Sequence, residues 1–182
     1  QAIRNRERIL IHGDYDTDGI TATSLLSWVL EKNGAVVSSF LPHRFDDGYG
    51  FTPESLAKAL ETAPSPCKVL VTVDCGINSC PAVADAASKG IDVIITDHHE
   101  PGEESSPALA IINPKVHKEL TDMHQLSGVG VAFKLAHAFV KYGRDNNLGG
   151  YATEMQDVLD FVALGTVADI VPLLGENRIL VK

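Results

Sequence analysis

The chain has 182 residues, 45% of them hydrophobic, which suits the core of one globular domain. Its formal net charge of −9 argues against a surface that holds duplex DNA by broad neutralisation of phosphates, although it permits nucleic acid at a metal site. No apolar stretch approaches the roughly 20 residues of a membrane-spanning helix, and the N-terminal residues resemble no secretion signal. The three cysteines are odd in number and lack zinc-ligand spacing, so we expect reduced thiols and a cytoplasmic protein.

The first part of the chain alternates short apolar runs with segments of helical spacing. Asn33-Gly34 is typical of a helix C-terminus, and Thr52-Pro53 is typical of a helix start. We therefore expect strands at 9–12, 35–41 and 68–73, and helices at 20–31 and 52–61.

The same alternation continues beyond residue 80 and then gives way to helices. We expect a helix at 81–88 capped by Asn78 or Ser79, strands at 91–96 and 108–112, and helices at 129–142 and 155–164. This order predicts an α/β fold with right-handed crossovers. The sheet should have five mostly parallel strands with helices on both faces, followed by a helical C-terminal part.

Acidic and imidazole side chains follow three of the predicted strands. Asp14, Asp16 and Asp18 alternate after the first strand, Asp74 follows the third, and Asp97-His98-His99 follows the fourth. In an open parallel sheet, the carboxyl ends of the strands form the ligand crevice. Unpaired carboxylates at close range repel one another, so the pattern predicts a divalent metal among them.

Carboxylate oxygens with some imidazole suit Mn²⁺ or Mg²⁺, and also Fe²⁺ or Zn²⁺. Asp74 should lie on a central strand, which makes it the best candidate to bridge two ions. Two ions about 3.5–4 Å apart would clamp the attacking and leaving oxygens of a displacement at phosphorus and lower the pKa of a bridging water. The candidate donors are His12, Asp16, Asp18, Asp74, His98 and Asp169.

The adjacent histidines call for a division of roles. Neighbouring side chains in extended backbone point apart, so one of His98 and His99 should be a ligand and the other should face the substrate. Asp97 would then accept a hydrogen bond from an imidazole N–H. We do not expect the remaining histidines, His43, His117, His124 and His137, to be ligands.

Several of these features also have other interpretations. An aspartate at a strand end often caps a helix or forms a turn. The Asp14–Gly19 segment is loosely similar to a calcium loop, but position twelve is Leu25 and a strand precedes the segment. A Walker-type phosphate loop and a GxGxxG motif are both absent. Gly128-Val129-Gly130 could cradle a phosphate at a helix start or simply permit close packing.

Taken in order, the motifs resemble the DHH phosphoesterase family, and most closely its RecJ-type single-strand-specific exonucleases. Asp97-His98-His99 matches the signature that names the family. The other matching segments are His12–Gly19, Arg44–Gly50, Val73–Gly76, Leu126–Leu135, Gly165–Pro172 and Gly175–Arg178. The resemblance runs over nearly the whole chain.

The resemblance implies a role for each candidate residue. One ion would be held by His12, Asp16 and Asp74, and the other by Asp18, Asp74, His98 and Asp169. His99 would contact the scissile phosphate, so the catalytic residues would be Asp16, Asp18, Asp74, His98, His99 and Asp169. Asp14 and Asp97 would support the site. Further contacts with the DNA strand would come from Arg44, Tyr49, Asn177 and Arg178.

The resemblance also implies an activity. RecJ-type enzymes degrade single-stranded DNA from the 5′ end with Mn²⁺ or Mg²⁺, in DNA repair and recombination, so we expect single-stranded DNA and repair or replication proteins as partners. Residues 1–182 would form the catalytic domain, without the DHHA1-type and OB-type domains that the family places after it. Two alternatives stay open. The substrate could be a short oligonucleotide, a cyclic dinucleotide or pyrophosphate, or the chain could be a non-catalytic replication scaffold.

Overall fold

The computed structural model describes residues 1–182 except 49, 64–65, 117–122, 149–150 and 152. Its centre is one sheet in the order β2-β1-β3-β4-β5, and every neighbouring pair of strands is parallel. The strands are β1 (Arg8–Gly13), β2 (Val36–Phe40), β3 (Cys67–Val73), β4 (Asp92–Thr96) and β5 (Ala110–Ile112). The predicted five-stranded parallel sheet is confirmed. The strand order reverses at β1 and β3, which is where open α/β sheets bind ligands.

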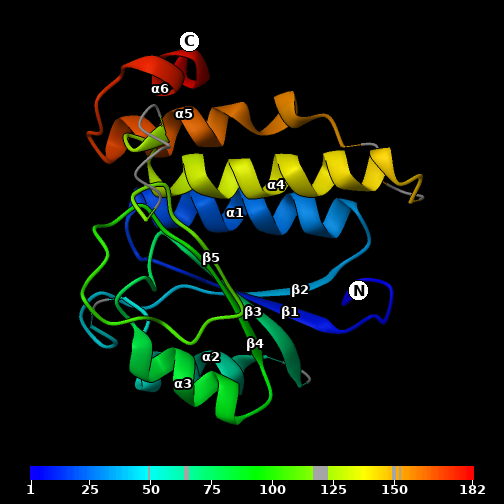
Figure 1. Cartoon of the computed structure of the whole chain (residues 1–182), viewed down its shortest axis with the longest axis vertical. Helices are drawn as coiled ribbons and strands as arrows, with labels where there is room; N and C mark the ends of the chain where they lie inside the picture. The colour runs from blue at the N-terminus through cyan, green and yellow to red at the C-terminus, as the bar shows by residue number, and fades with distance from the viewer. Residues whose placement is uncertain (49, 64–65, 117–122, 149–150, 152) are drawn as a thin grey trace.

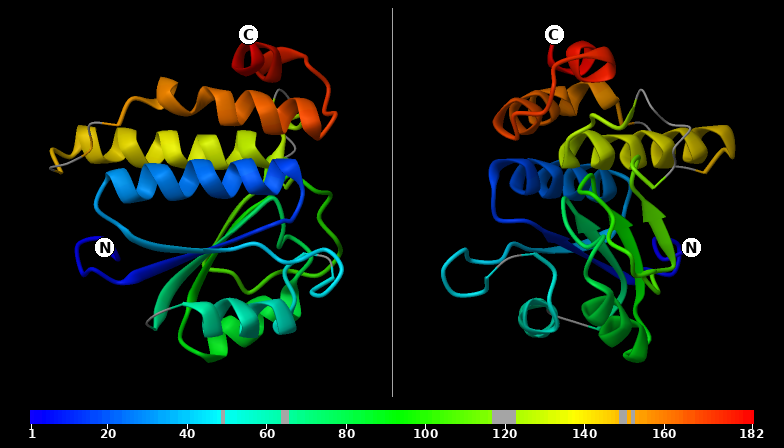
Figure 2. Two further views of the ribbon diagram at one scale, coloured as in Figure 1. Left: turned by 180° about the vertical axis from the view of Figure 1, so that it is seen from behind. Right: turned by 60° about the vertical axis from the view of Figure 1, so that its left-hand side comes forward.

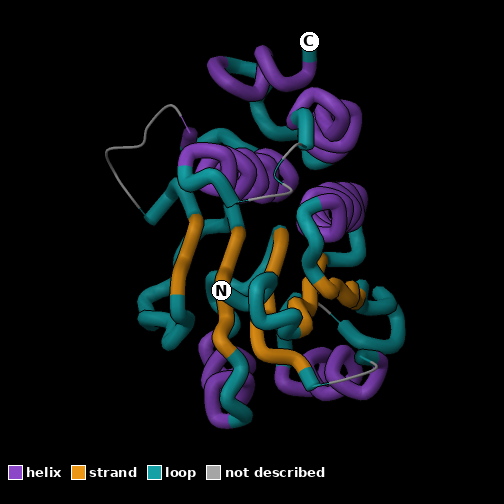
Figure 3. Tube along the Cα trace, turned by 90° about the vertical axis from the view of Figure 1, so that its right-hand side faces the viewer, coloured by secondary structure: helices purple, strands orange, loops and turns teal. Residues whose placement is uncertain are grey.

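Helices cover both faces of the sheet, as predicted. They are α1 (Thr17–Lys32), α2 (Pro53–Thr62), α3 (Cys80–Ser88), α4 (Gly128–Asp145), the 3₁₀ turn η2 (Met155–Val158), α5 (Leu159–Ala168) and α6 (Gly175–Val181). Helices α2 and α3 lie on one face, and α1 and α4 lie on the other (Figure 1). Figures 2 and 3 show α5 and α6 beyond the layer formed by α1 and α4, farther from the sheet. None of the helices described could span a membrane, given their length and hydropathy.

Strand β1 supplies side chains to both faces of the sheet. Ile9 and Ile11 belong to the core under α1 and α4, whereas Leu10 belongs to the core under α2 and α3. Alternate residues of a strand point to opposite faces of the sheet. Because both faces are covered here, β1 has an almost continuous run of apolar residues. The same parity directs His12, two residues after Leu10, toward the side of α2.

The predicted helix signals are partly confirmed. Thr52 forms a capping box with Ser55 at the start of α2. Ser79 occupies the N-cap of α3 but makes no side-chain capping bond; Asn78 instead bonds the backbone of Glu100 and Gly102. The helix expected at 155–164 begins as a 3₁₀ turn and extends to Ala168. Helix α6 was not predicted, because its seven residues lack a clear apolar period.

Candidate metal centre

Asp74 is the first residue after β3, and its backbone geometry is unusual. Its φ of +61° lies in the left-handed region, which is uncommon for a residue other than glycine. Its amide donates to the carbonyl of Thr96 at 3.0 Å, which continues the pairing of β3 with β4. Such strain costs about 1–3 kcal/mol and tends to occur at functional sites. Here it occurs at a residue that is 2% exposed.

The start of helix α4 packs directly against Asp74 and holds Asp18. A Cβ added at Gly128 would lie 2.4 Å from Asp74 Oδ1, so the contact requires glycine. The amides of Gly128 and Val129 donate to the two carboxylate oxygens of Asp18, at 2.6 and 2.8 Å. A helix N-terminus favours such a negative charge. Gly128 therefore permits the close packing, and its amide and that of Val129 bind a carboxylate of the protein itself.

Asp97 organises the two histidines that follow it. Its Oδ1 accepts hydrogen bonds from the amides of His98 (2.7 Å) and His99 (3.1 Å) and from His99 Nδ1 (2.7 Å). Its Oδ2 accepts from the amide of Ile77 at 2.9 Å. Burial alone would raise the pKa of Asp97, but these hydrogen bonds outweigh it and lower the pKa. The predicted hydrogen bond from an imidazole to Asp97 is present.

His98 lies at the meeting point of three carboxylates. Its Nε2 is 3.2 Å from Asp74 Oδ1, 3.7 Å from Asp169 Oδ2 and 3.9 Å from Asp18 Oδ2. His98, Asp74 and Asp169 follow β4, β3 and α5, and Asp18 lies in the first turn of α1, so distant parts of the chain meet here. Burial raises the pKa of Asp74 to about 10, with the charges of Asp18 and Asp16 adding to the effect. Burial also raises the pKa of Asp18, to about 6, and that of Asp169.

Two atoms at this point are buried without a hydrogen-bond partner, namely Asp74 Oδ1 and His98 Nε2. An unpaired buried polar atom costs about 1–3 kcal/mol, and most such atoms in proteins are satisfied. A divalent cation would satisfy both, because carboxylate oxygen and imidazole nitrogen are ligands of Mn²⁺. The residues present therefore fit a metal ion.

A second acidic group adjoins the first. Asp14, Asp16 and Asp74 each offer an oxygen, and these atoms lie within 4.8 Å of one another; the same holds for Asp18, His98 and Asp169. Asp14 Oδ1 is also buried without a partner. Asp74 belongs to the first of these groups and contacts His98 of the other. This is the position that a bridging carboxylate would need.

The position of His12 differs from the predicted ligand set. Its Nε2 lies 3.0 Å from Ser55 Oγ on α2, and its Nδ1 lies 3.9 Å from Cys75 Sγ. The ring is fully buried next to Phe40 and Phe51, and burial lowers its pKa to about 4. The strand period directs this ring away from the carboxylates. Of the two residues His12 and Asp14, Asp14 is the one that belongs to a possible metal-binding group.

The predicted substrate contacts are distributed unevenly. Arg44 is exposed, with its guanidinium 5.3 Å from the centre of the Tyr15 ring, beside the first acidic loop. Arg178 is exposed on α6. Asn177 is 1% exposed, and its amide donates to the carbonyls of Gln125 and Pro172, so its geometry is that of a structural residue. Tyr49 lies outside the described residues.

Sequence reasoning missed Asn113. Its Nδ2 donates to the carbonyl of His99 at 2.9 Å, and its Oδ1 accepts from the amide of Lys115 at 2.9 Å. It therefore ties the end of β5 to the histidine loop. The available signal was the Asn113-Pro114 pair directly after a strand, which is typical of a turn.

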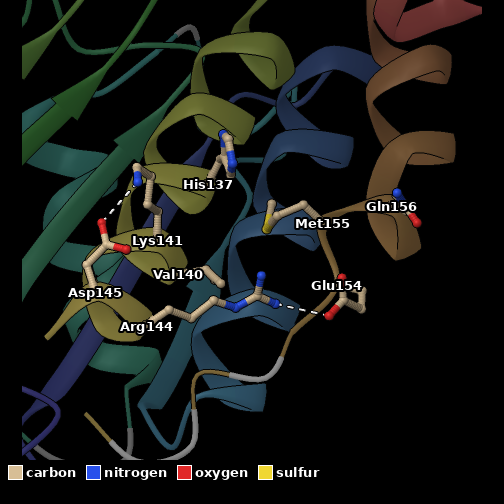
Figure 4. A pocket seen from close by; sticks show the side chains of 8 residues that line it. All are labelled: His137, Val140, Lys141, Arg144, Asp145, Glu154, Met155 and Gln156. Carbon is tan, nitrogen blue, oxygen red and sulfur yellow. Dashed lines mark hydrogen bonds and ion pairs between the residues drawn. The ribbon is translucent and has the colours of Figure 1, made fainter. Parts of the chain in front are cut away.

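A separate cavity of about 370 Å³ lies at the other end of α4 (Figure 4). Its charged side chains pair with one another, Lys141 with Asp145 at 3.0 Å and Arg144 with Glu154 at 3.1 Å (Figure 4). No group of possible metal ligands among the described residues falls there. The candidate site is therefore the carboxylate cluster at the strand ends.

Comparison with known proteins agrees with this fold and site. Residues 8–166 match the DHH family, N-terminal domain, so the chain belongs to the DHH family. It is 43% identical over 180 residues to the single-stranded-DNA-specific exonuclease RecJ of Bacillus subtilis, an alignment that covers 99% of this chain and 21% of that protein. The chain spans about a fifth to a third of the length of such curated relatives.

Solved structures show the same arrangement. An exonuclease RecJ bound to manganese superposes with a TM-score of 0.84 at 38% identity, over 99% of this chain and 43% of that one. RecJ of Thermus thermophilus in complex with Mn²⁺ gives a TM-score of 0.79 at 35% identity, over 98% of this chain and 24% of that one. The predicted family and α/β fold are both confirmed.

Proposed function

We propose that residues 1–182 form the catalytic domain of a metal-dependent exonuclease that degrades single-stranded DNA in the 5′→3′ direction. The observation that carries the proposal is the pair of buried atoms Asp74 Oδ1 and His98 Nε2, which lie 3.2 Å apart without a hydrogen bond, next to two groups of possible metal ligands. The relatives named as single-stranded-DNA-specific exonucleases support the choice of substrate. Structures of RecJ with Mn²⁺ and with Mg²⁺ support the choice of metal.

Two divalent ions would be held by this chain. Asp14, Asp16 and Asp74 would hold one, and Asp18, Asp74, His98 and Asp169 would hold the other. When bound, such ions supply positive charge that stabilises a phosphoryl transition state and make water sufficiently acidic to attack at neutral pH. The hydrogen bonds from Gly128 and Val129 fix Asp18 in place, so this carboxylate needs little reorganisation to bind an ion.

His99 is the residue best placed to meet the phosphate. Its side chain is 55% exposed, and its Nδ1 is occupied by Asp97, so Nε2 is the nitrogen that can reach a substrate. The hydrogen bond to Asp97 raises the pKa of His99 to about 9. A protonated ring at neutral pH would donate to a phosphate oxygen and stabilise its developing negative charge.

Side chains outside the metal centre would contact the DNA strand. Arg44, beside the acidic loop, would contact a phosphate, with Tyr49 and Arg178 as further contacts. The three free thiols agree with a cytoplasmic site of action. The enzyme would act there in DNA repair or recombination, with repair or replication proteins as partners.

The proposal predicts that Asp74→Asn abolishes activity. Removing the shared carboxylate should lower Mn²⁺-dependent release of nucleotides from a 5′-labelled single strand by about 10³-fold or more, the scale of losing a group that acts in the transition state. Asp92→Asn is the matched control, because Asp92 is exposed at the opposite end of the neighbouring strand β4.

The readout should separate metal binding from chemistry. Calorimetry with Mn²⁺ should give two binding events for the unchanged chain and for Asp92→Asn, and weaker binding for Asp74→Asn. Undiminished nucleotide release by Asp74→Asn would contradict the proposal. So would equal cleavage of duplex and single-stranded DNA.

A further inference from the structure

A cavity of about 610 Å³ adjoins the candidate metal centre and shares His98 and Asp169 with it. Its size lies in the range of about 300–1,000 Å³ typical of small-molecule sites. Building on the proposed function, we propose that this cavity holds the nucleotide next to the scissile phosphate, and that Lys115 and His124, which line it, contact a phosphate of that nucleotide.

One wall of the cavity is fixed to the histidine loop. The backbone amide of Lys115 donates to Asn113 Oδ1, and Asn113 Nδ2 donates to the carbonyl of His99. Asn113 is only 2% exposed. Because the buried side chain of Asn113 joins the backbone of Lys115 to the DHH motif, that backbone keeps a defined position relative to the metal centre.

The facing wall is fixed by helix α6. Asn177 donates from Nδ2 to the carbonyl of Gln125 at 2.6 Å and to that of Pro172 at 3.0 Å, and both of those residues line the cavity. Two segments about 50 positions apart in the sequence are thereby held together by one buried amide. These hydrogen bonds hold Gln125 and Pro172 in place without a ligand, which reduces the entropic cost of binding.

The charges around the cavity favour a phosphate ligand. The neighbouring metal centre is rich in carboxylates and the chain carries a net charge of −9, so a phosphodiester needs local positive charge to approach. Lys115 provides it. Its Nζ lies 3.2 Å from Glu100 Oε1, but the Glu100 side chain is 80% exposed, and such an exposed ion pair is weak. A phosphate can replace Glu100 at little cost.

The direct test is calorimetric binding of thymidine 5′-monophosphate to the Mn²⁺-loaded chain. Lys115→Met should weaken binding about tenfold, while Lys115→Arg should largely restore it. Glu100→Gln should strengthen binding, because it removes the competing carboxylate. Lys68→Met is the matched control, because Lys68 is exposed near the start of β3, at the end of the strand opposite the metal centre. Thymidine without a phosphate should not distinguish the variants.

A kinetic test shows whether Lys115 acts in substrate binding or in the chemical step. With a short single-stranded oligonucleotide, Lys115→Met should raise KM and leave kcat and the affinity for Mn²⁺ unchanged. It should also lower the salt dependence of KM by the slope of about 0.7 expected for one lost contact with a single strand. With bis(p-nitrophenyl) phosphate, which carries no neighbouring nucleotide, the variant should match the unchanged chain.

The outcomes separate this inference from the function on which it rests. Equal affinity of Lys115→Met and the unchanged chain for thymidine 5′-monophosphate overturns the inference, as does a chain that binds Mn²⁺ but no nucleotide. These binding measurements need no turnover. Failure of the exonuclease proposal would appear instead as undiminished cleavage by Asp74→Asn.

Discussion

At the scale of single residues, His12 and Asp14 lie differently from the predicted arrangement. His12 was expected among the metal ligands, and Asp14 was expected to support the site. In the structure His12 contacts Ser55 on the α2 side, whereas Asp14 presents a buried, unpartnered oxygen near Asp16 and Asp74. The strand period carries this information, because His12 shares its face with Leu10. The prediction from residue types did not take that parity into account.

Substitution of His12 tests this reading. His12→Ala should lower the free energy of unfolding by about 2–4 kcal/mol, because it empties a fully buried site and removes the contact between the imidazole ring and Ser55 Oγ. The affinity for Mn²⁺, measured by calorimetry, should change less than about threefold. Ser55→Ala should give a smaller loss of stability in the same direction. A loss of Mn²⁺ affinity on the scale of a missing ligand would contradict this account and make His12 a ligand.

Most of the candidate site was predictable from residue types alone. Asp18, Asp74, His98 and Asp169 follow elements whose apolar runs are plain in the sequence, and they converge as expected. The parts that were not predictable depend on tertiary contacts. Asn177 looked like a substrate contact because it is polar within a family motif, yet its amide is used by two backbone carbonyls of distant loops.

At the scale of elements, the start of α4 determines the shape of the metal centre. Its first amides hold Asp18, and its first residue lies against Asp74. The sequence predicted this helix to within a few residues, but it left open whether Gly128 and Gly130 serve a ligand or packing. Only the position of the helix relative to β3 resolves that question, and helix position is not encoded in local periodicity.

Substitution by alanine should affect Mn²⁺ affinity differently at Gly128 and at Gly130. Gly128→Ala would place a methyl group 2.4 Å from Asp74 Oδ1, so the helix or the carboxylate must move, and Mn²⁺ affinity should fall about 10–100-fold. In Gly130→Ala the new methyl group would lie 3.2 Å from Leu126 Cδ2, with Leu126 Cβ and Ser127 Oγ at 3.4 and 3.5 Å. No carboxylate of the metal centre is among these neighbours, so the affinity for Mn²⁺ should stay near that of the unchanged chain. Calorimetry on both variants, with thermal melts as a check of folding, would contradict this account if the two behaved alike.

At the scale of the whole molecule, the buried carboxylates link stability to pH. Burial raises the pKa of Asp18 to about 6 and that of Asp74 to about 10, so the native state retains protons that the unfolded chain releases near pH 4. Stability from these groups is present at low pH and is lost as the pH rises toward those values. The network of charges is therefore unfavourable at neutral pH without metal.

This linkage predicts opposite responses with and without metal. In EDTA, the midpoint of thermal unfolding should fall between pH 6 and pH 8. With Mn²⁺ held at 100 times its Kd at pH 6, each bound ion should stabilise the chain by about 2.7 kcal/mol at that pH. At the same Mn²⁺ concentration the gain should grow with pH, because the ligands must lose their protons. Asp74→Asn should reduce both effects. A midpoint in EDTA that rises across this range would show that the carboxylates are not the dominant groups.

The hydrogen bonds from Gly128 and Val129 to Asp18 join positions 110 and 111 residues apart. No short peptide cut from this chain could reproduce that contact, because the N-terminal loop reaches its final geometry only after α4 arrives. During refolding, tight capture of manganese should accordingly be a late event. Its time course would report when that helix docks, rather than when the sheet first assembles.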